Sequence, residues 1–152
     1  MSSSPKPQAP SPSPKIQTTK LVLTNGVFDI LHPGHIRYLQ AARALGDRLI
    51  VAINSDRSVR ALGKAPNRPL NPELERAEVL RALACVDEVV IFDEPDPHAI
   101  ISKIQPDILV KGADWAEDAI IGRDIVEARG GQVVRIPMAP GYSTTEIIKR
   151  IL

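Results

Sequence analysis

The stretch that decides the fold lies near the start of the chain, at residues 21–35, and reads LVLTNGVFDILHPGH. Its first part, Leu21-Val22-Leu23, is a short apolar run, and the Thr24-Asn25-Gly26 that follows is typical of a turn, so we expect a buried strand that ends there. A helix then fits His35 to Leu45, where apolar side chains recur at helical spacing and Gly46 suits the C-terminal end. The stretch therefore predicts a strand, a turn and a helix in succession.

The same alternation of strand and helix continues to the end of the chain. Short apolar runs without polar alternation predict buried strands in a parallel sheet that is covered on both faces. We therefore expect an α/β fold, a Rossmann-like doubly wound sheet of about five parallel strands with helices on both faces. The further strands are predicted at 49–53, 88–92, 108–110 and 132–136, and the further helices at about 56–62, 72–84, 97–104, 118–128 and 144–152.

Three of these helices start with a capping signal. Asn71-Pro72 and Asp96-Pro97 each place a capping side chain before a proline, which we expect at the first helical position. Ser143-Thr144-Thr145-Glu146 matches the capping box, with Ser143 as the cap and Glu146 three residues on. The signals predict where these helices begin.

Composition limits the class of protein. A length of 152 residues suits one α/β domain, and a hydrophobic fraction of 43% is ordinary for a globular protein. The formal charge of +1 gives no case for nucleic acid or an anionic membrane surface as a partner. Cys85 is the single cysteine, so no intramolecular disulfide is possible, and no apolar run or leader indicates a membrane span or secretion. We expect a soluble, cytoplasmic protein.

Residues 1–18 differ in composition from the rest of the chain. Five prolines alternate there with serine, lysine, glutamine and alanine, and almost no apolar side chain is present to be buried. We expect a disordered, Pro/Ser-rich tail that serves solubility, with recognition as a proline-rich ligand as the alternative. The domain itself is predicted to span residues 19–152.

Two histidines after the first predicted strand mark the expected site. Ligands of open α/β sheets bind beyond the carboxyl ends of the strands, and His32-Pro33-Gly34-His35 lies there, at the predicted start of a helix. Backbone amides at a helix start favour an anion, Gly34 and Gly26 allow close approach, and imidazoles donate hydrogen bonds to phosphate oxygens. The alternatives are surface histidines, a helix cap or a metal site; zinc is disfavoured because Cys85 and His98 lie elsewhere.

These residues resemble a known family. Gly26-Val27-Phe28-Asp29 together with His32-Pro33-Gly34-His35 resembles the signature of the HxGH nucleotidyltransferase superfamily. Four further segments resemble the heptose 1-phosphate adenylyltransferases, which occur alone or as the second half of a bifunctional kinase–adenylyltransferase. The segments are 54–56, 68–72, 110–115 and 142–148, and the resemblance covers about residues 20–152.

The resemblance implies a reaction. An oxygen of D-glycero-β-D-manno-heptose 1-phosphate attacks the α-phosphorus of ATP, which gives ADP-heptose for lipopolysaccharide core synthesis and releases pyrophosphate. Mg²⁺ accompanies ATP and is held mainly by its oxygens, with no protein ligand assigned. The family also implies a homo-oligomer, most commonly a dimer. The sequence contains no kinase half, so we expect another protein to phosphorylate the sugar.

The resemblance also implies roles for individual residues. The two histidines are expected to contact the α- and β-phosphates, and a cation in the following loop, either Lys64 or Arg68, to close over them. Asp29 is expected to hold the loop, orient an imidazole or meet the sugar, and Trp115 to face the nucleotide or pack. The expected sets are catalytic His32, His35, Lys64 and Arg68; nucleotide-binding Thr24, Asn25, Gly26, Phe28, Gly34, Lys111, Gly112, Ser143, Thr144 and Thr145; and substrate-binding Asp29, Asn54, Asp56 and Asp114.

Several features leave alternatives open. Ala113 stands where the resemblance leads us to expect glycine, and the loop 63–68 is slightly longer than expected. Capping alone would explain Ser143, and solvation alone would explain the loop cations. Rival functions are a cytidylyltransferase of the glycerol 3-phosphate type, a guanylyltransferase acting on α-heptose phosphate, and a nucleotide-binding module without catalysis.

Overall fold

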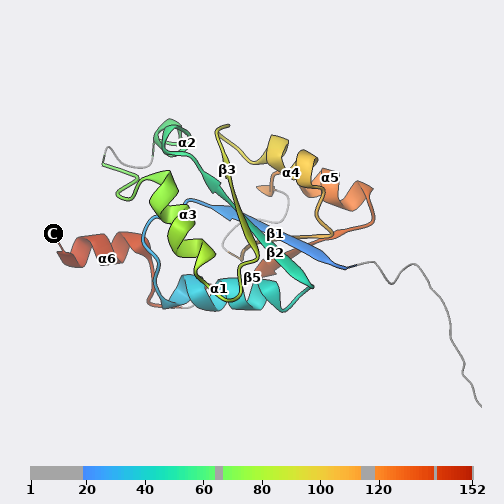
Figure 1. Cartoon of the computed structure of the whole chain (residues 1–152), viewed down its shortest axis with the longest axis horizontal. Helices are drawn as coiled ribbons and strands as arrows, with labels where there is room; N and C mark the ends of the chain where they lie inside the picture. Colours follow the sequence, from blue (N-terminus) through green and yellow to red (C-terminus); the bar gives the residue numbers. More distant parts are fainter. Residues whose placement is uncertain (1–18, 64–66, 114–118, 139, 152) are drawn as a thin grey trace, which may run out of the picture.

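The computed structural model describes residues 19–63, 67–113, 119–138 and 140–151, so the predicted tail 1–18 lies outside the described residues. Strands and helices alternate along the chain, as the sequence predicts (Figure 1). In chain order, the elements are β1 Leu21–Gly26, α1 Pro33–Arg43, β2 Arg48–Asn54, α2 Asp56–Ala61, α3 Glu73–Arg81, β3 Glu88–Phe92, α4 His98–Ile104, β4 Ile108–Gly112, α5 Arg123–Ala128, β5 Gln132–Ile136 and α6 Thr144–Ile151.

The sheet confirms the predicted doubly wound topology. Its five strands are all parallel and lie in the order β3-β2-β1-β4-β5, so β1 is central. The chain winds from β1 outward to β3 and then crosses to β4 on the other side of β1. Loops that leave β1 and β4 therefore diverge, which opens a crevice at their carboxyl ends, where open α/β sheets bind ligands.

Two separate cores explain why the strands carry continuous apolar runs. Successive side chains of a strand point to opposite faces, so Leu49, Val51 and Ile53 belong to one core, whereas Ile50 and Ala52 belong to the other. The first core packs α1 and α3 against the sheet, and the second packs α4 and α5, which lie on the opposite side in Figure 1. Helices on both faces leave no polar face on the sheet.

Two predicted helix starts are wrong by one or two residues. α1 begins at Pro33 rather than His35, because His32 is its N-cap. α3 begins at Glu73 with Pro72 as N-cap and no side-chain cap, so Asn71 is not the cap that we predicted. The Asn71 side chain instead donates from Nδ2 to the backbone oxygen of Asp29, at 2.6 Å.

The starts of the later helices also differ in detail. α4 begins at His98 with Pro97 as its N-cap and no side-chain cap, so Asp96 is not the cap that we predicted, although its carboxylate accepts from the His98 amide at 2.9 Å. α5 begins at Arg123 rather than near residue 118, because Gly122 has a φ of 94°. At α6, Ser143 Oγ accepts from the Glu146 amide at 2.9 Å, as the capping box predicts.

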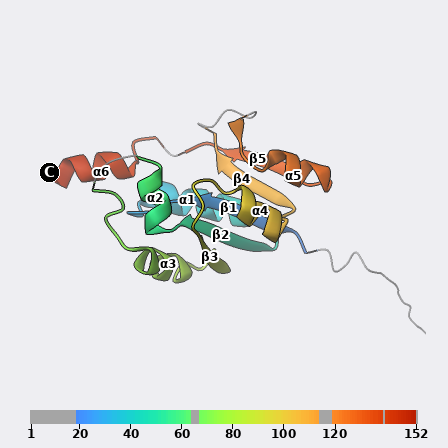
Figure 2. The ribbon, with the colours of Figure 1, turned by 90° about the horizontal axis from the view of Figure 1, so that it is seen from above.

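α6 stands apart from the layers of the fold. It extends away from the sheet in both views of the ribbon (Figures 1 and 2), and it contains no buried residue. The Thr144 hydroxyl donates to the Ile30 carbonyl at 3.0 Å, which attaches the start of α6 to the loop after β1. Within the described part of the chain, no helix has the length and apolar character needed to cross a membrane.

Thr24 lies in the core instead of at the site. It has no exposed surface, and its hydroxyl donates to the Val110 carbonyl at 3.0 Å and lies 2.8 Å from the Tyr38 hydroxyl. These bonds join β1, β4 and α1. In this structure Thr24 has no surface with which to contact a nucleotide, although we predicted that contact.

We expect Thr24→Val to lower the free energy of unfolding by about 1–3 kcal/mol, because it leaves buried polar partners unsatisfied. Tyr38→Phe is the matched variant and should cost only about 1 kcal/mol, since Thr24 keeps its bond to Val110. Urea unfolding measures both. A Thr24→Val protein with unchanged stability and weakened ATP binding would show that Thr24 serves the ligand instead.

Candidate active site

The two histidines cap helix α1 with their side chains. His32 Nδ1 accepts a hydrogen bond from the Gly34 amide at 3.1 Å, and His35 Nδ1 accepts from the His32 amide at 3.3 Å. The pair forms a reciprocal capping box in which imidazole replaces the usual hydroxyl and carboxylate. Because Nδ1 accepts in both rings, the proton of each neutral imidazole lies on Nε2. The cap is thus compatible with a role as hydrogen-bond donors.

The histidine rings belong to a column of aromatic side chains. The centroids of His32 and His35 lie 3.9 Å apart, with 28° between the ring planes. Tyr142 stacks beside His32 at 5.9 Å, and Phe28 lies 5.4 Å from His35. A Cβ at Gly34 would stand 2.9 Å from the His32 ring and 3.0 Å from Tyr142 Cβ, so only glycine fits. The column fixes both ring orientations.

The electrostatics of the pair favour neutral imidazoles. Burial lowers the pKa of His32 below its ordinary value of 6.5. Burial, followed by the influence of the His32 ring, lowers the pKa of His35 from 6.5 to about 4. Two cations at this ring separation would repel each other. At pH 7 both rings therefore offer a neutral N–H.

Asp29 holds the loop before α3 against the end of β1. Its side chain has no exposed surface and accepts from Arg68 Nε at 2.9 Å, from the Leu70 amide at 2.8 Å and from the Asn71 amide at 2.9 Å. Of the three roles that we expected for Asp29, the structure shows the first. Its contact with substrate stays a prediction.

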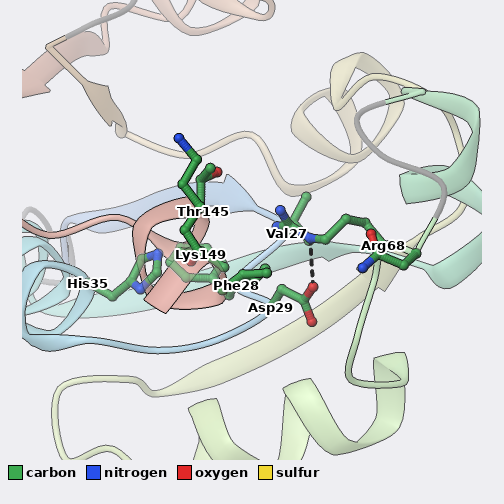
Figure 3. Close-up of a pocket in the computed structure, with 10 residues that line it drawn as sticks. Val27, Phe28, Asp29, His35, Arg68, Thr145 and Lys149 are labelled. Atoms are coloured by element: carbon green, nitrogen blue, oxygen red, sulfur yellow. Dashed lines mark hydrogen bonds and ion pairs between the residues drawn. The ribbon is translucent and has the colours of Figure 1, made fainter. Parts of the chain in front are cut away.

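The largest cluster of predicted residues surrounds a cavity of about 450 Å³. We call it the histidine cavity, because His35 lines it. Figure 3 shows its side chains gathered between His35 on one side and Arg68, paired with Asp29, on the other. Its lining is Val27, Phe28, Asp29, His35, Asn67, Arg68, Thr144, Thr145, Ile148 and Lys149.

A second cavity, of about 300 Å³, lies across Val27 from the first. We call it the lysine cavity, because Lys111 from the end of β4 lines it, and Lys111 Nζ donates to Asn25 Oδ1 at 3.2 Å. Residues from the ends of β1, β2 and β4 and from the loop after β3 meet here, which is where the topology predicts a ligand. Its lining is Asn25, Gly26, Val27, Asn54, Leu62, Pro95, Asp96, Pro97, Lys111 and Ile121.

The structure separates the predicted loop cations. Arg68 lines the histidine cavity and is 14% exposed at its side chain, with Nε paired to Asp29, so it is held in place and is not a solvated loop charge in this structure. The two terminal nitrogens of its guanidinium are not used in that pair. Lys64 lies outside the described residues, as do Asp114 and Trp115. The choice between Lys64 and Arg68 therefore stays a prediction.

Several other predicted residues have structural partners. His32 is 6% exposed and stacks on His35, but it does not line the histidine cavity and instead lines a separate hollow of about 520 Å³ beside Pro33. Asp56 pairs with Arg76 at 2.8 Å, and Asn54 donates to Ser58 Oγ at 3.0 Å while also lining the lysine cavity. Gly112 ends β4.

Thr144 and Thr145, at the start of α6, line the histidine cavity. The Thr144 hydroxyl is bound to the Ile30 carbonyl, so only the backbone of Thr144 is left to contact a phosphate.

Three residues of the site were not among our predicted contacts. Lys149 reaches the histidine cavity from α6, and its side chain is 71% exposed. Tyr142 stacks on His32, although the sequence showed it only as part of a motif. Arg76 is buried and bonds to carbonyls beside both cavities. Helical spacing could have placed Lys149 near Thr145, but nothing local indicated the partners of Arg76.

The described carboxylates do not form a metal site. Among the residues that the structure describes, no three or more His, Cys, Asp or Glu side chains cluster as metal ligands would. Asp29 is the carboxylate of the described histidine cavity, and its oxygens are taken by Arg68 and backbone amides.

Comparison with known proteins gives the class to which this fold and site belong. The model of the cytidylyltransferase-like family matches residues 23–150, from β1 into α6, and includes both cavities. The chain belongs to this family of HxGH nucleotidyltransferases.

Particular relatives lie within that family. The chain is 54% identical over 132 residues to the bifunctional protein HldE of Syntrophotalea carbinolica, covering 87% of this chain and 27% of that protein. It is 56% identical over 131 residues to the bifunctional protein HldE of Hyphomonas neptunium, covering 86% and 27%. The chain thus spans about a quarter of the length of these relatives.

A solved structure supports the same placement. The crystal structure of the lipopolysaccharide core biosynthesis protein from Thermoplasma volcanium matches with a TM-score of 0.69 and 32% identity, covering 80% of this chain and 98% of that one. The two proteins therefore share their fold over nearly the whole of the Thermoplasma protein and over most of this chain.

We expect NMR titration of the ligand-free chain to give His35 a midpoint at about pH 4. In the unfolded chain His35 takes up its proton near 6.5, so the stability that the neutral ring contributes is complete above that pH and is lost as the pH falls toward 4. The difference in unfolding free energy between the protein and His35→Gln should change in that window and stay constant above it. A His35 midpoint near 6.5 would contradict the assigned burial.

Proposed function

We propose that the chain transfers AMP from ATP to D-glycero-β-D-manno-heptose 1-phosphate and releases pyrophosphate, which gives ADP-heptose for lipopolysaccharide core synthesis. The observation that carries the proposal is the capped His35, whose Nε2–H is left for a ligand in a cavity that also contains Arg68 and Lys149. The similarity to the HldE proteins and to the Thermoplasma protein supports the choice of acceptor.

The reaction needs positioning and charge stabilisation more than proton transfer. A phosphate oxygen of the sugar 1-phosphate is already ionised at pH 7, so it attacks the α-phosphorus without a general base. The bond from the α-phosphorus to its bridging oxygen breaks as the new bond forms, and both electrons leave with pyrophosphate. No covalent intermediate with the protein is required. Donors that are fixed in advance lower the barrier because they need not reorganise.

The chain supplies such donors from three directions. The Nε2–H of His35 is directed by its cap, and the His32 ring, stacked against it, is proposed to share the contact with the α- and β-phosphates. The Arg68 guanidinium is fixed by Asp29, and the start of α6 presents Thr145. A helix start favours anions through its amides and dipole. Phosphates in the histidine cavity would meet all three.

Mg²⁺ is proposed to enter with ATP, where it neutralises charge on the triphosphate. Family membership supports a divalent cation, and the occupied oxygens of Asp29 support a metal carried by the nucleotide. The chain's own contribution is then the cationic side chains around the phosphates.

The lysine cavity is proposed to hold the rest of the acceptor, so Asn25 and Lys111, which we predicted to bind the nucleotide, are proposed here to bind the sugar phosphate instead. Asn25, Asn54 and Asp96 supply amide and carboxylate groups that match sugar hydroxyls, and Lys111 supplies a positive charge for a phosphate. The cavity borders the histidine cavity at Val27, so an acceptor there would lie next to the reacting phosphorus. Because ATP and sugar phosphates are cytoplasmic metabolites, we also propose that the chain acts in the cytoplasm.

Pyrophosphate release, measured across nucleotides and phosphorylated acceptors, tests the function. We expect turnover with ATP and the β-heptose 1-phosphate and at least about tenfold less with CTP, GTP, glycerol 3-phosphate or the α-anomer. Preference for CTP with glycerol 3-phosphate would support the cytidylyltransferase. Tight nucleotide binding without turnover on any acceptor would indicate a binding module.

His32→Asn is the matched active-site variant within this assay. Asparagine keeps a cap for α1 but lacks the imidazole Nε2–H, so we expect near-normal stability and a fall in turnover of about 10²–10³. His35→Asn should behave alike. If His32→Asn retained near-normal turnover, the proposed contact of His32 with phosphate would be wrong. The description of the fold would still hold.

We further propose a homodimer in which α6 packs against a second copy of the chain. Ile147 and Ile148 are half-buried and Ile151 is 74% exposed, and a helix of this length is not stable without packing partners. Sedimentation velocity should show a dimer for the full chain and a shift toward monomer for Ile151→Glu. A monomer for the unaltered chain at micromolar concentration would contradict the proposal.

A further inference from the structure

Arg76 is a charged side chain buried away from both cavities, yet it is bonded to the backbone around them. It lies on α3, and its side chain has no exposed surface. Asp56 Oδ1, 2.8 Å from Arg76 Nη2, is its carboxylate partner. The other hydrogen bonds of the guanidinium go to main-chain carbonyls.

Those carbonyls belong to segments that form the site. Nη1 donates to the Val27 oxygen at 2.8 Å and to the Asn54 oxygen at 2.9 Å, and Nε donates to the Asn71 oxygen at 2.9 Å. Val27 lines both cavities, and Asn54 lines the lysine cavity. The Asn71 amide binds Asp29, which pairs with Arg68. One guanidinium thus connects the ends of β1 and β2 with the loop that carries Arg68.

The chemistry of the guanidinium suits this connection. It is planar and carries five N–H donors in a rigid fork, whereas a lysine ammonium is a single centre on a flexible stem. Apolar residues that pack well often stabilise a core as much as a buried ion pair does. Stability alone therefore does not account for a buried arginine whose donors meet four oxygens from three segments of the chain.

We propose that Arg76 is a positioning residue of the active site. It sets the position of Val27 between the two cavities and, through Asn71 and Asp29, the position of Arg68. It touches no substrate. The expected change in kcat depends on the proposed nucleotidyl transfer. The expected change in the position of the backbone does not depend on that reaction.

Arg76→Lys tests the proposal, with Arg81→Lys as the matched control. Arg81 lies on the same helix and donates to the Val89 carbonyl at 3.3 Å, away from the cavities. We expect Arg76→Lys to lower kcat by about 10²-fold, because small misplacements of reacting groups have effects of that size. The KM for ATP should change less than about threefold, since Arg76 itself does not touch the nucleotide. Arg81→Lys should leave both constants unchanged.

Hydrogen exchange provides a second readout that does not depend on activity. The amides of Leu70 and Asn71 are bound to Asp29, so their exchange should quicken in Arg76→Lys and stay unchanged in Arg81→Lys, while β5 is unaffected in both. If the unaltered chain shows no turnover but exchange responds as expected, the proposed reaction is wrong and the positioning role stands.

Asp56→Asn covers the case in which Arg76→Lys does not fold. It removes the ionic anchor and leaves the three carbonyl bonds, so we expect a fewfold fall in kcat together with faster exchange at Leu70. Unchanged exchange and unchanged kcat in a folded Arg76→Lys protein, or in Asp56→Asn if the lysine variant is unfolded, would overturn the proposal. Equal losses of kcat in Arg76→Lys and Arg81→Lys would also overturn it.

Discussion

The buried carboxylate of Asp29 is the interaction on which the arrangement of the site depends. It receives the Arg68 guanidinium and the amides of Leu70 and Asn71, while its backbone oxygen receives the Asn71 side chain. A carboxylate that is buried away from water costs free energy unless its oxygens accept hydrogen bonds or pair with a cation in this way. The segment before α3 is thereby joined to the end of β1, and α3 in turn carries Arg76 back to the same strand end. Asp29 and Arg76 hold one backbone network from two sides.

The histidines combine two requirements in one pair of side chains. A helix start has amides without partners, and here the Nδ1 atoms of His32 and His35 accept from two of them. That use fixes the proton on Nε2, and burial keeps the rings neutral by lowering each pKa. Directional hydrogen bonding therefore comes from the imidazoles, whereas positive charge comes from separate residues such as Arg68 and Lys149.

The sequence predicted features that depend on local pattern and failed where distant partners decide. Apolar runs were sufficient for the parallel sheet, because strands covered on both faces require them. The His32–His35 motif was found for its spacing, but its capping geometry was only one alternative. Thr24 looked like a pocket residue because it precedes the motif, whereas its partners Tyr38 and Val110 come from other elements. The bonds of Arg76 lie up to 49 residues away along the chain, where no periodicity could indicate them.

The bond between the Thr144 hydroxyl and the Ile30 carbonyl joins residues 114 positions apart. All five strands precede α6 in the chain, so the sheet and both cores can assemble while one wall of the histidine cavity is still missing. The lysine cavity, whose described lining ends at Ile121, needs none of α6. During synthesis on the ribosome, the two cavities would therefore be completed in order, the lysine cavity first and the histidine cavity only when the helix at residues 144–151 has left the exit tunnel. The order of the elements thus allows the sheet to fold before the site is complete.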